Sequence, residues 1–179
     1  MTVMAYHFVG ETLRDGRPVP PDGEWLEHSG RCVLCRSGLH ASRSPFDALK
    51  YAPGATLCLV ECAGVEGEEG DKLVCRRRRI VKRIDATDLL RKFARQCALD
   101  VIHLWDAPDV VRRYLETGDE SLRAAARDAA WVDAWSAARA AARAAAGDAA
   151  WAAATAAAGA AQHKRFNDMV KDAMRGIGG

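Results

Sequence analysis

The sequence lacks the features that usually mark exported, membrane-bound or nucleic-acid-binding proteins. Its 179 residues carry a formal net charge of +2, which gives little attraction for nucleic acid or an anionic membrane. The N-terminus has neither the basic start nor the apolar stretch of a signal peptide. Outside a weakly apolar alanine tract, no charge-free apolar run reaches the roughly 18 residues of a membrane span. We therefore expect a cytoplasmic protein without membrane attachment.

Familiar catalytic and metal-binding motifs are also missing. There is no phosphate loop, no G-x-S-x-G, no H-E-x-x-H and no supported Cys-His pair. In the cytoplasm the cysteines should be reduced thiols. The spacing of the cysteines only approximates that of a zinc site, with one pair at Cys32 and Cys35 and another at Cys58 and Cys62. We therefore expect the cysteines to be small buried hydrophobic residues, and we expect no bound metal. The arginine run at 76–79 is interpreted as a solvated strand edge, and nucleic acid is not an expected partner.

Composition changes sharply along the chain. Of the 38 residues from Ala124 to Ala161, 24 are alanine, whereas residues 1–118 resemble an average globular protein. The length suits a small domain with an appendage. We predict an α+β protein, with a small mixed β-sheet domain at 1–84 and an alanine-rich helical module at 85–179.

Turn residues and apolar periodicity predict the individual elements. Ser44 and Pro45 mark the start of a short helix that ends at Tyr51. The segment after the strand at 56–64 reads as a mobile acidic loop, and the basic residues of the next strand are assigned to its solvent face. Strands are expected at 1–10, 31–37, 56–64 and 72–85, and helices at 85–104 and 106–118.

In the alanine-rich tract, nearly every fourth residue is not alanine, and most of these residues are arginine or tryptophan. On a helix, this spacing places them in a stripe. Gly147 can end one helix and Asp148 can cap the next, so two packed helices are predicted over 119–175. The tryptophans either fill the module's own core or bind a protein partner or a second copy. The candidate partner-binding residues are Trp131, Trp135, Arg139 and Trp151.

The segment GLHASRSPFDALKYAPG, residues 38–54, together with its flanking strands resembles the core of the ADP-ribosyltransferases over about residues 4–84. His7 occupies the first strand, a Gly-Leu-x-x-Ser element follows, and a short helix ends at a tyrosine. The resemblance implies an NAD-binding cleft and a glutamate on a later strand. The implied ligand-binding residues are His7, His40, Ser42 and Tyr51, and the carboxylates nearest the catalytic position are Glu69 and Asp71.

Lys72 stands near the position where the glutamate is expected. Its charge would oppose the cationic transition state of ADP-ribosyl transfer, which a carboxylate should stabilise. The sequence therefore favours binding of a nucleotide-like ligand without catalysis. The alternative is an NAD-dependent ADP-ribosyltransferase that modifies a macromolecule. A third reading makes His7 and His40 ordinary hydrogen-bonded interior histidines.

Motifs along nearly the whole chain resemble an uncharacterised family of bacterial and phage proteins. They include YHF, GLHAS, DALKYAPG and FARQCALDVIHLW, in this order. The part that begins at Phe93 is also similar to helical immunity proteins that accompany bacterial toxins. The resemblance implies a phage, prophage or defence setting and assigns no catalytic residue.

Overall fold

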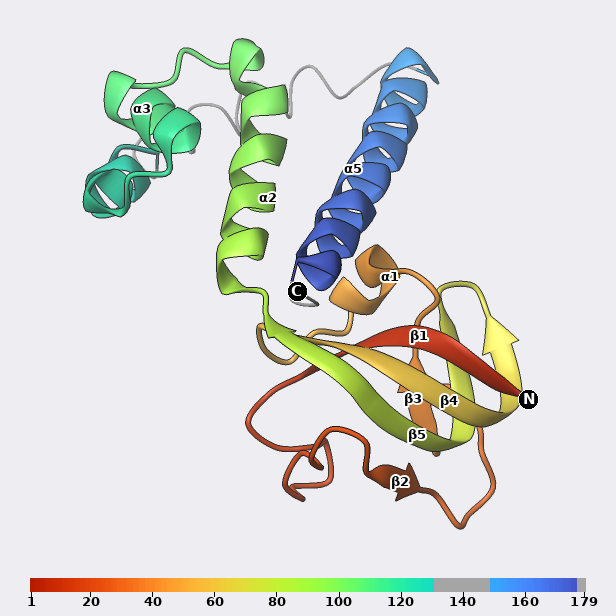
Figure 1. Cartoon of the computed structure of the whole chain (residues 1–179). Coiled ribbons are helices and arrows are strands. Elements are labelled where there is room, and N and C mark those ends of the chain that lie inside the picture. The colour runs from red at the N-terminus through yellow and green to blue at the C-terminus, as the bar shows by residue number, and fades with distance from the viewer. Residues whose placement is uncertain (131–148, 177–179) are drawn as a thin grey trace. The chain divides into compact units, whose positions relative to one another are not determined.

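The structure is a computed structural model that describes residues 1–130 and 149–176 (Figure 1). The chain divides into two compact units, Met1–Leu89 with Arg165–Gly179, and Leu90–Lys164. The first holds an antiparallel sheet of five strands, and helices follow in the chain. The expected α+β class is confirmed. No helix in the described ranges is long and apolar enough to cross a membrane.

The sheet is built around a long hairpin of β4 and β5, joined at Gly70, where φ is 59°. Glycine adopts this left-handed conformation without the steric cost of a side chain. The sheet order is β1-β4-β5-β2, and β3 pairs with another part of β5. The strands are β1 (Thr2–Val9), β2 (Trp25–Glu27), β3 (Leu39–Ala41), β4 (Thr56–Glu69) and β5 (Lys72–Asp85).

A backbone bridge closes the sheet on itself. The Tyr6 N–H donates to the Ser42 carbonyl at 2.7 Å, and the Ser42 N–H donates to the Tyr6 carbonyl at 2.9 Å. Because β1 also pairs with β4, β4 with β5 and β5 with β3, these four strands form a continuous hydrogen-bonded ring. The bridge brings His7 on β1 and His40 on β3 close to each other.

Small side chains make up much of the core of this sheet. The buried cluster includes Ala5, Ala41, Cys58, Cys62 and Cys75. Cys58 and Cys62 are 0% exposed, so the expectation of small buried hydrophobes is confirmed for them. It is wrong for Cys35, which is exposed in a turn. Because small residues fill little volume, the centre of the sheet has room for a longer side chain.

Two segments have a different secondary structure from the one expected. Residues 31–37 form a tight turn instead of a strand: Val33 and Ser37 exchange backbone hydrogen bonds of 2.8 and 2.9 Å. Cys35 within this turn has a φ of 65°. The acidic segment at 65–69 is not a loop but the end of β4, because it pairs with the start of β5.

The first unit is completed by α1 (Pro45–Leu49) and by the last part of α5 (Ala149–Arg175). The helix α1 starts as predicted, with the Ser44 hydroxyl accepting from the Asp47 N–H at 3.2 Å, and ends earlier than expected. From α5, the fully buried Phe166 ring lies 6.1 Å from that of Phe46. The end of the chain therefore packs into the N-terminal unit.

The second unit is helical. Its elements are most of α2 (Thr87–Asp100), η1 (Ile102–Leu104), α3 (Asp109–Thr117), η2 (Glu120–Leu122), a helical stretch at 123–130 and the first part of α5. The helix expected over 85–104 is shorter, because α2 ends at Asp100 and a 3-10 turn follows. Gly118, with a φ of 71°, ends α3 as predicted.

Most of the predicted partner-binding residues lie outside the described residues. Trp131, Trp135 and Arg139 fall in the segment 131–148, as does the predicted break at 147–148. Trp151 lies in α5. Their role in binding a partner stays a prediction.

Candidate functional site

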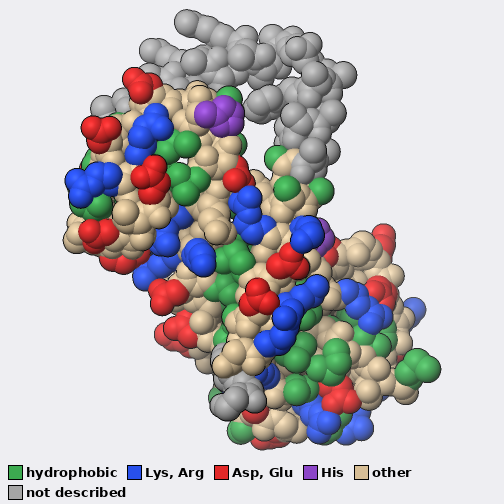
Figure 2. All heavy atoms as spheres, turned by 45° about the horizontal axis from the view of Figure 1, so that its top comes forward, with side chains coloured by type: hydrophobic (Ala, Val, Ile, Leu, Met, Phe, Trp, Pro, Cys, Tyr) green, Lys and Arg blue, Asp and Glu red, His purple; other side chains and the backbone are tan. Residues whose placement is uncertain are grey.

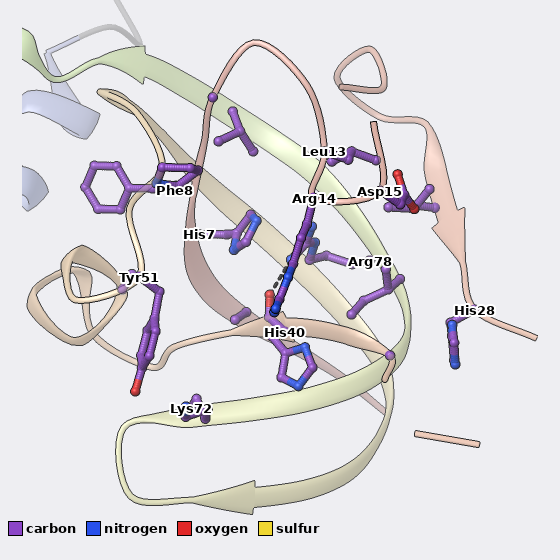
Figure 3. Close-up of a pocket in the computed structure, with 18 of the residues that line it drawn as sticks. His7, Phe8, Leu13, Arg14, Asp15, His28, His40, Tyr51, Lys72 and Arg78 are labelled. Carbon is purple, nitrogen blue, oxygen red and sulfur yellow. Dashed lines mark hydrogen bonds between the residues drawn. The ribbon is translucent and has the colours of Figure 1, made fainter. Parts of the chain in front are cut away.

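A cavity of about 1010 Å³ lies in the first unit (Figure 3). Its walls are formed by β1, the loop at 10–17, the end of β2, the turn at 35–38, β3, α1 with the segment after it, and two side chains of β5. The volume is at the upper end of the range for small-molecule sites. The residues predicted to bind a ligand all line it: His7, His40, Ser42 and Tyr51. The structure thus brings them together, while their binding role stays a prediction.

Arg78 is the prominent site residue that sequence reasoning missed. Its side chain lines the cavity, is only 7% exposed, and donates a hydrogen bond from Nη1 to the His40 carbonyl. Burial lowers the pKa of the guanidinium, and the ionisable groups that act on it are buried cysteines, not carboxylates. Burying a cation without a counter-ion costs several kcal/mol, even after relaxation. Arg78 therefore needs an explanation beyond packing.

The other arginines of the run at 76–79 are all paired with glutamates. The Nε atoms of Arg76 and Arg77 lie 2.8 Å from carboxylate oxygens, and that of Arg79 lies 2.7 Å from one. The interpretation of the whole run as a solvated edge is wrong for Arg78. Alternation along the strand was the available signal, because Arg78 is two residues from the buried Ile80 and shares its face.

His7 projects from β1 into the same space. Burial is the main cause that holds the pKa of His7 well below its usual 6.5, and the charges of Arg78 and His40 lower it further. The imidazole is therefore neutral at pH 7 and offers one donor and one acceptor nitrogen.

His40 has a clear structural role. Its Nε2 accepts a hydrogen bond of 3.0 Å from the Cys35 N–H, so the ring proton is on Nδ1. Burial lowers the pKa of His40, as do the charges of Arg78, Lys72 and, more weakly, Arg14. His40 thus holds the turn at 35–38, as an interior histidine would, and also forms part of the cavity wall.

Tyr51 stands at the Lys72 side of the cavity. Its hydroxyl donates to Asp71 Oδ1 at 2.8 Å, and Lys72 Nζ lies 4.2 Å from the centre of its ring. The second Asp71 oxygen accepts from Lys50 Nζ at 3.0 Å. The Tyr51 and Lys50 hydrogen bonds hold the pKa of Asp71 below its usual range.

The two predicted catalytic carboxylates do not line the cavity. Asp71 points to Tyr51 and Lys50, and Glu69 is exposed at the end of β4. The carboxylates that do line it were not predicted: Glu11, Asp15 and Glu27. Within the described ranges, no three His, Cys, Asp or Glu side chains are placed to hold a metal ion.

The sequence of residues 3–92 matches a family described as "Domain of unknown function (DUF7666)". The chain belongs to this family. The match includes every residue that lines the cavity, so the cavity is contained within the DUF7666 domain. No curated protein and no solved structure matches the chain.

Proposed function

We propose that this DUF7666 protein is a binding protein whose N-terminal domain holds an anionic, nucleotide-like small molecule in the cavity without chemical conversion. The observation that carries the proposal is Arg78, a buried cation of the cavity wall without a carboxylate partner among the described residues. A bound anion would supply the missing counter-charge, and a guanidinium suits phosphate geometry. His7 and Tyr51 add polar groups of the kind that orient a ligand.

The positions of the charged side chains around the cavity support binding of the ligand without its chemical conversion. Transfer of ADP-ribose develops positive charge on the ribose, so its transition state needs a carboxylate beside it. Glu69 and Asp71 lie outside the cavity, whereas Lys72 lies in its wall. If the protein were instead an NAD-dependent ADP-ribosyltransferase, Glu11 would be the available carboxylate, because the other two that line the cavity pair with arginines.

The alanine-rich helices complete the proposal. We assign them to a protein partner or to self-association, in the phage, prophage or defence setting that the sequence resemblance suggests. Support for this part comes from the stripe of tryptophan and arginine in the sequence. The ligand-binding proposal does not depend on it.

A thermal-shift assay with ADP-ribose and NAD tests the proposal. Both should raise the melting temperature of the wild type and of the control Arg79→Met, whose arginine pairs with Glu61 outside the cavity. Arg78→Met should show no ligand-induced shift. Incubation with a labelled NAD analogue should leave any added protein unmodified. Labelling that disappears in Glu11→Gln would establish the enzyme instead.

A further inference from the structure

The cavity wall carries unequal charge. Its basic residues are Arg14, Arg17, Arg36, Lys72 and Arg78, and its acidic residues are Glu11, Asp15 and Glu27. Two of the acids are already neutralised, because Asp15 accepts from Arg17 Nε at 2.9 Å and Glu27 lies 2.8 Å from Arg77 Nε. Four cations then face one remaining carboxylate, so a single negative charge on a ligand would not balance the site.

Several of these cations act on one part of the cavity. Arg78, Lys72 and Arg14 all perturb the same imidazole, that of His40. Figure 3 shows the side chains of Arg14 and Arg78 approaching His7 and His40 from different elements, the loop after β1 and the strand β5. The positive charge is therefore concentrated around the two histidines.

The backbone at Arg14 is fixed by the fold of its loop. The Leu13 N–H donates to the Arg17 carbonyl at 2.8 Å, and the Gly16 N–H donates to the Leu13 carbonyl at 2.9 Å. These bonds close a tight turn around Arg14, whose exposed side chain makes no ion pair with any described residue. Its guanidinium is free to bind a ligand that enters the cavity.

Building on the proposed function, we propose that the ligand carries at least two negative charges on phosphoryl groups, and that Arg14 and Arg78 bind the same phosphoryl group. A phosphoryl group offers several acceptor oxygens, so it can take hydrogen bonds from two guanidinium groups at once. A carboxylate has two oxygens and one charge, which a single arginine already satisfies. The site should therefore select phosphoryl compounds over carboxylates of equal or higher charge.

Isothermal titration with inorganic pyrophosphate, AMP, adenosine and citrate tests this selection at constant ionic strength. Pyrophosphate and AMP should bind at least about tenfold more tightly than adenosine and citrate, because a charge-assisted hydrogen bond contributes about one to two orders of magnitude. Arg14→Met should weaken AMP at least about tenfold and leave adenosine unchanged. The control Arg43→Met removes an arginine that pairs with Glu68 outside the cavity. It should leave the affinities for AMP and adenosine unchanged.

The outcomes separate this inference from the proposed function. The proposed function stands if ADP-ribose binds and Arg78→Met abolishes this binding. The phosphoryl selection is nevertheless wrong if citrate binds as tightly as AMP, or if Arg14→Met does not change the affinity for AMP. If neither ADP-ribose nor any anionic probe binds at millimolar concentration, both are wrong. Arg14 is exposed, so its substitution gives an answer even if Arg78→Met fails to fold.

Discussion

Replacing Arg78 by methionine should make the protein more stable while removing its ligand binding. Methionine keeps an unbranched chain of similar length, so the space among the small core residues stays filled. The variant removes a buried cation that has no carboxylate partner among the described residues. Its effect on folding therefore tests whether Arg78 is retained for function at a cost in stability.

The expected change in the free energy of unfolding of Arg78→Met is the sum of opposing contributions. Removing the buried charge recovers a desolvation cost of several kcal/mol. Losing its hydrogen bond leaves the His40 carbonyl without that donor, which costs about 1 to 3 kcal/mol. Replacement of buried ionic groups by packed apolar ones is often neutral or stabilising by about 1 to 4 kcal/mol. We expect a net gain of about 1 to 2 kcal/mol in the free energy of unfolding, or roughly 2 to 8 °C in Tm.

Urea unfolding followed by circular dichroism, with no ligand present, measures this difference. The control Arg79→Met removes an arginine that is 38% exposed and paired with Glu61, so it should change the free energy of unfolding by less than about 1 kcal/mol. A loss of 2 kcal/mol or more in Arg78→Met, at an unchanged urea dependence, would show that the arginine is a net structural stabiliser. The buried charge of Arg78 would then not be a net cost to the folded state.

Three further predictions concern the histidines, the turn before β3 and the end of the chain. Because burial lowers the pKa of His7 in the folded state, the stability contributed by the neutral imidazole is present above pH 6.5 and is lost as the pH falls toward the lowered pKa. In urea titrations above pH 6.5 and at pH 5, the wild type should therefore lose more unfolding free energy than His7→Gln, by up to about 2 kcal/mol. Equal losses would contradict the burial of a neutral imidazole. At Gly38, where φ is +105°, alanine would place a Cβ 2.6 Å from a methyl carbon of Val74. Gly38→Ala should therefore lower the free energy of unfolding in urea by about 2 to 3 kcal/mol. The loss should exceed that of Gly16→Ala, whose Cβ meets nothing within 4 Å, and equal losses would contradict the close approach. Phe166→Ala should destabilise the N-terminal unit by about 3 to 5 kcal/mol, because it removes a fully buried ring. The loss should appear as faster hydrogen exchange of the β-sheet amides. Unchanged exchange would show that α5 does not support this unit.

Local signals in the sequence were sufficient for several elements. Ser44 and Pro45 fix the start of α1 through a side-chain cap and a preset backbone angle, and Gly118 ends α3 in a left-handed conformation. Such signals act within a few residues, which is why they can be read from the sequence alone. They do not report on strand pairing, and the acidic segment at 65–69 became part of β4 because β5 pairs with it.

The candidate site was predicted only in part. The first strand supplied His7, the GLHAS segment supplied His40 and Ser42, and the end of the short helix supplied Tyr51; all four line one cavity. Lys72 was also expected near the ligand, but Arg14 and Arg78 escaped prediction because their place in the cavity depends on tertiary structure. In the sequence, only the alternation of side chains along β5 separates Arg78 from its neighbours, and the closed ring of strands determines which face is inside. Figure 2 shows acidic and basic side chains interspersed over the visible surface, in keeping with the small net charge, so composition does not reveal the local excess in the cavity.

The most direct test of the account is an isothermal titration of ADP-ribose into wild-type protein and Arg78→Met, both shown to be folded by circular dichroism. We expect measurable binding to the wild type and an affinity at least about tenfold lower for the variant, because the variant lacks the cation that balances the ligand's negative charge. Equal affinities would contradict the claim that Arg78 is the centre of an anion-binding cavity.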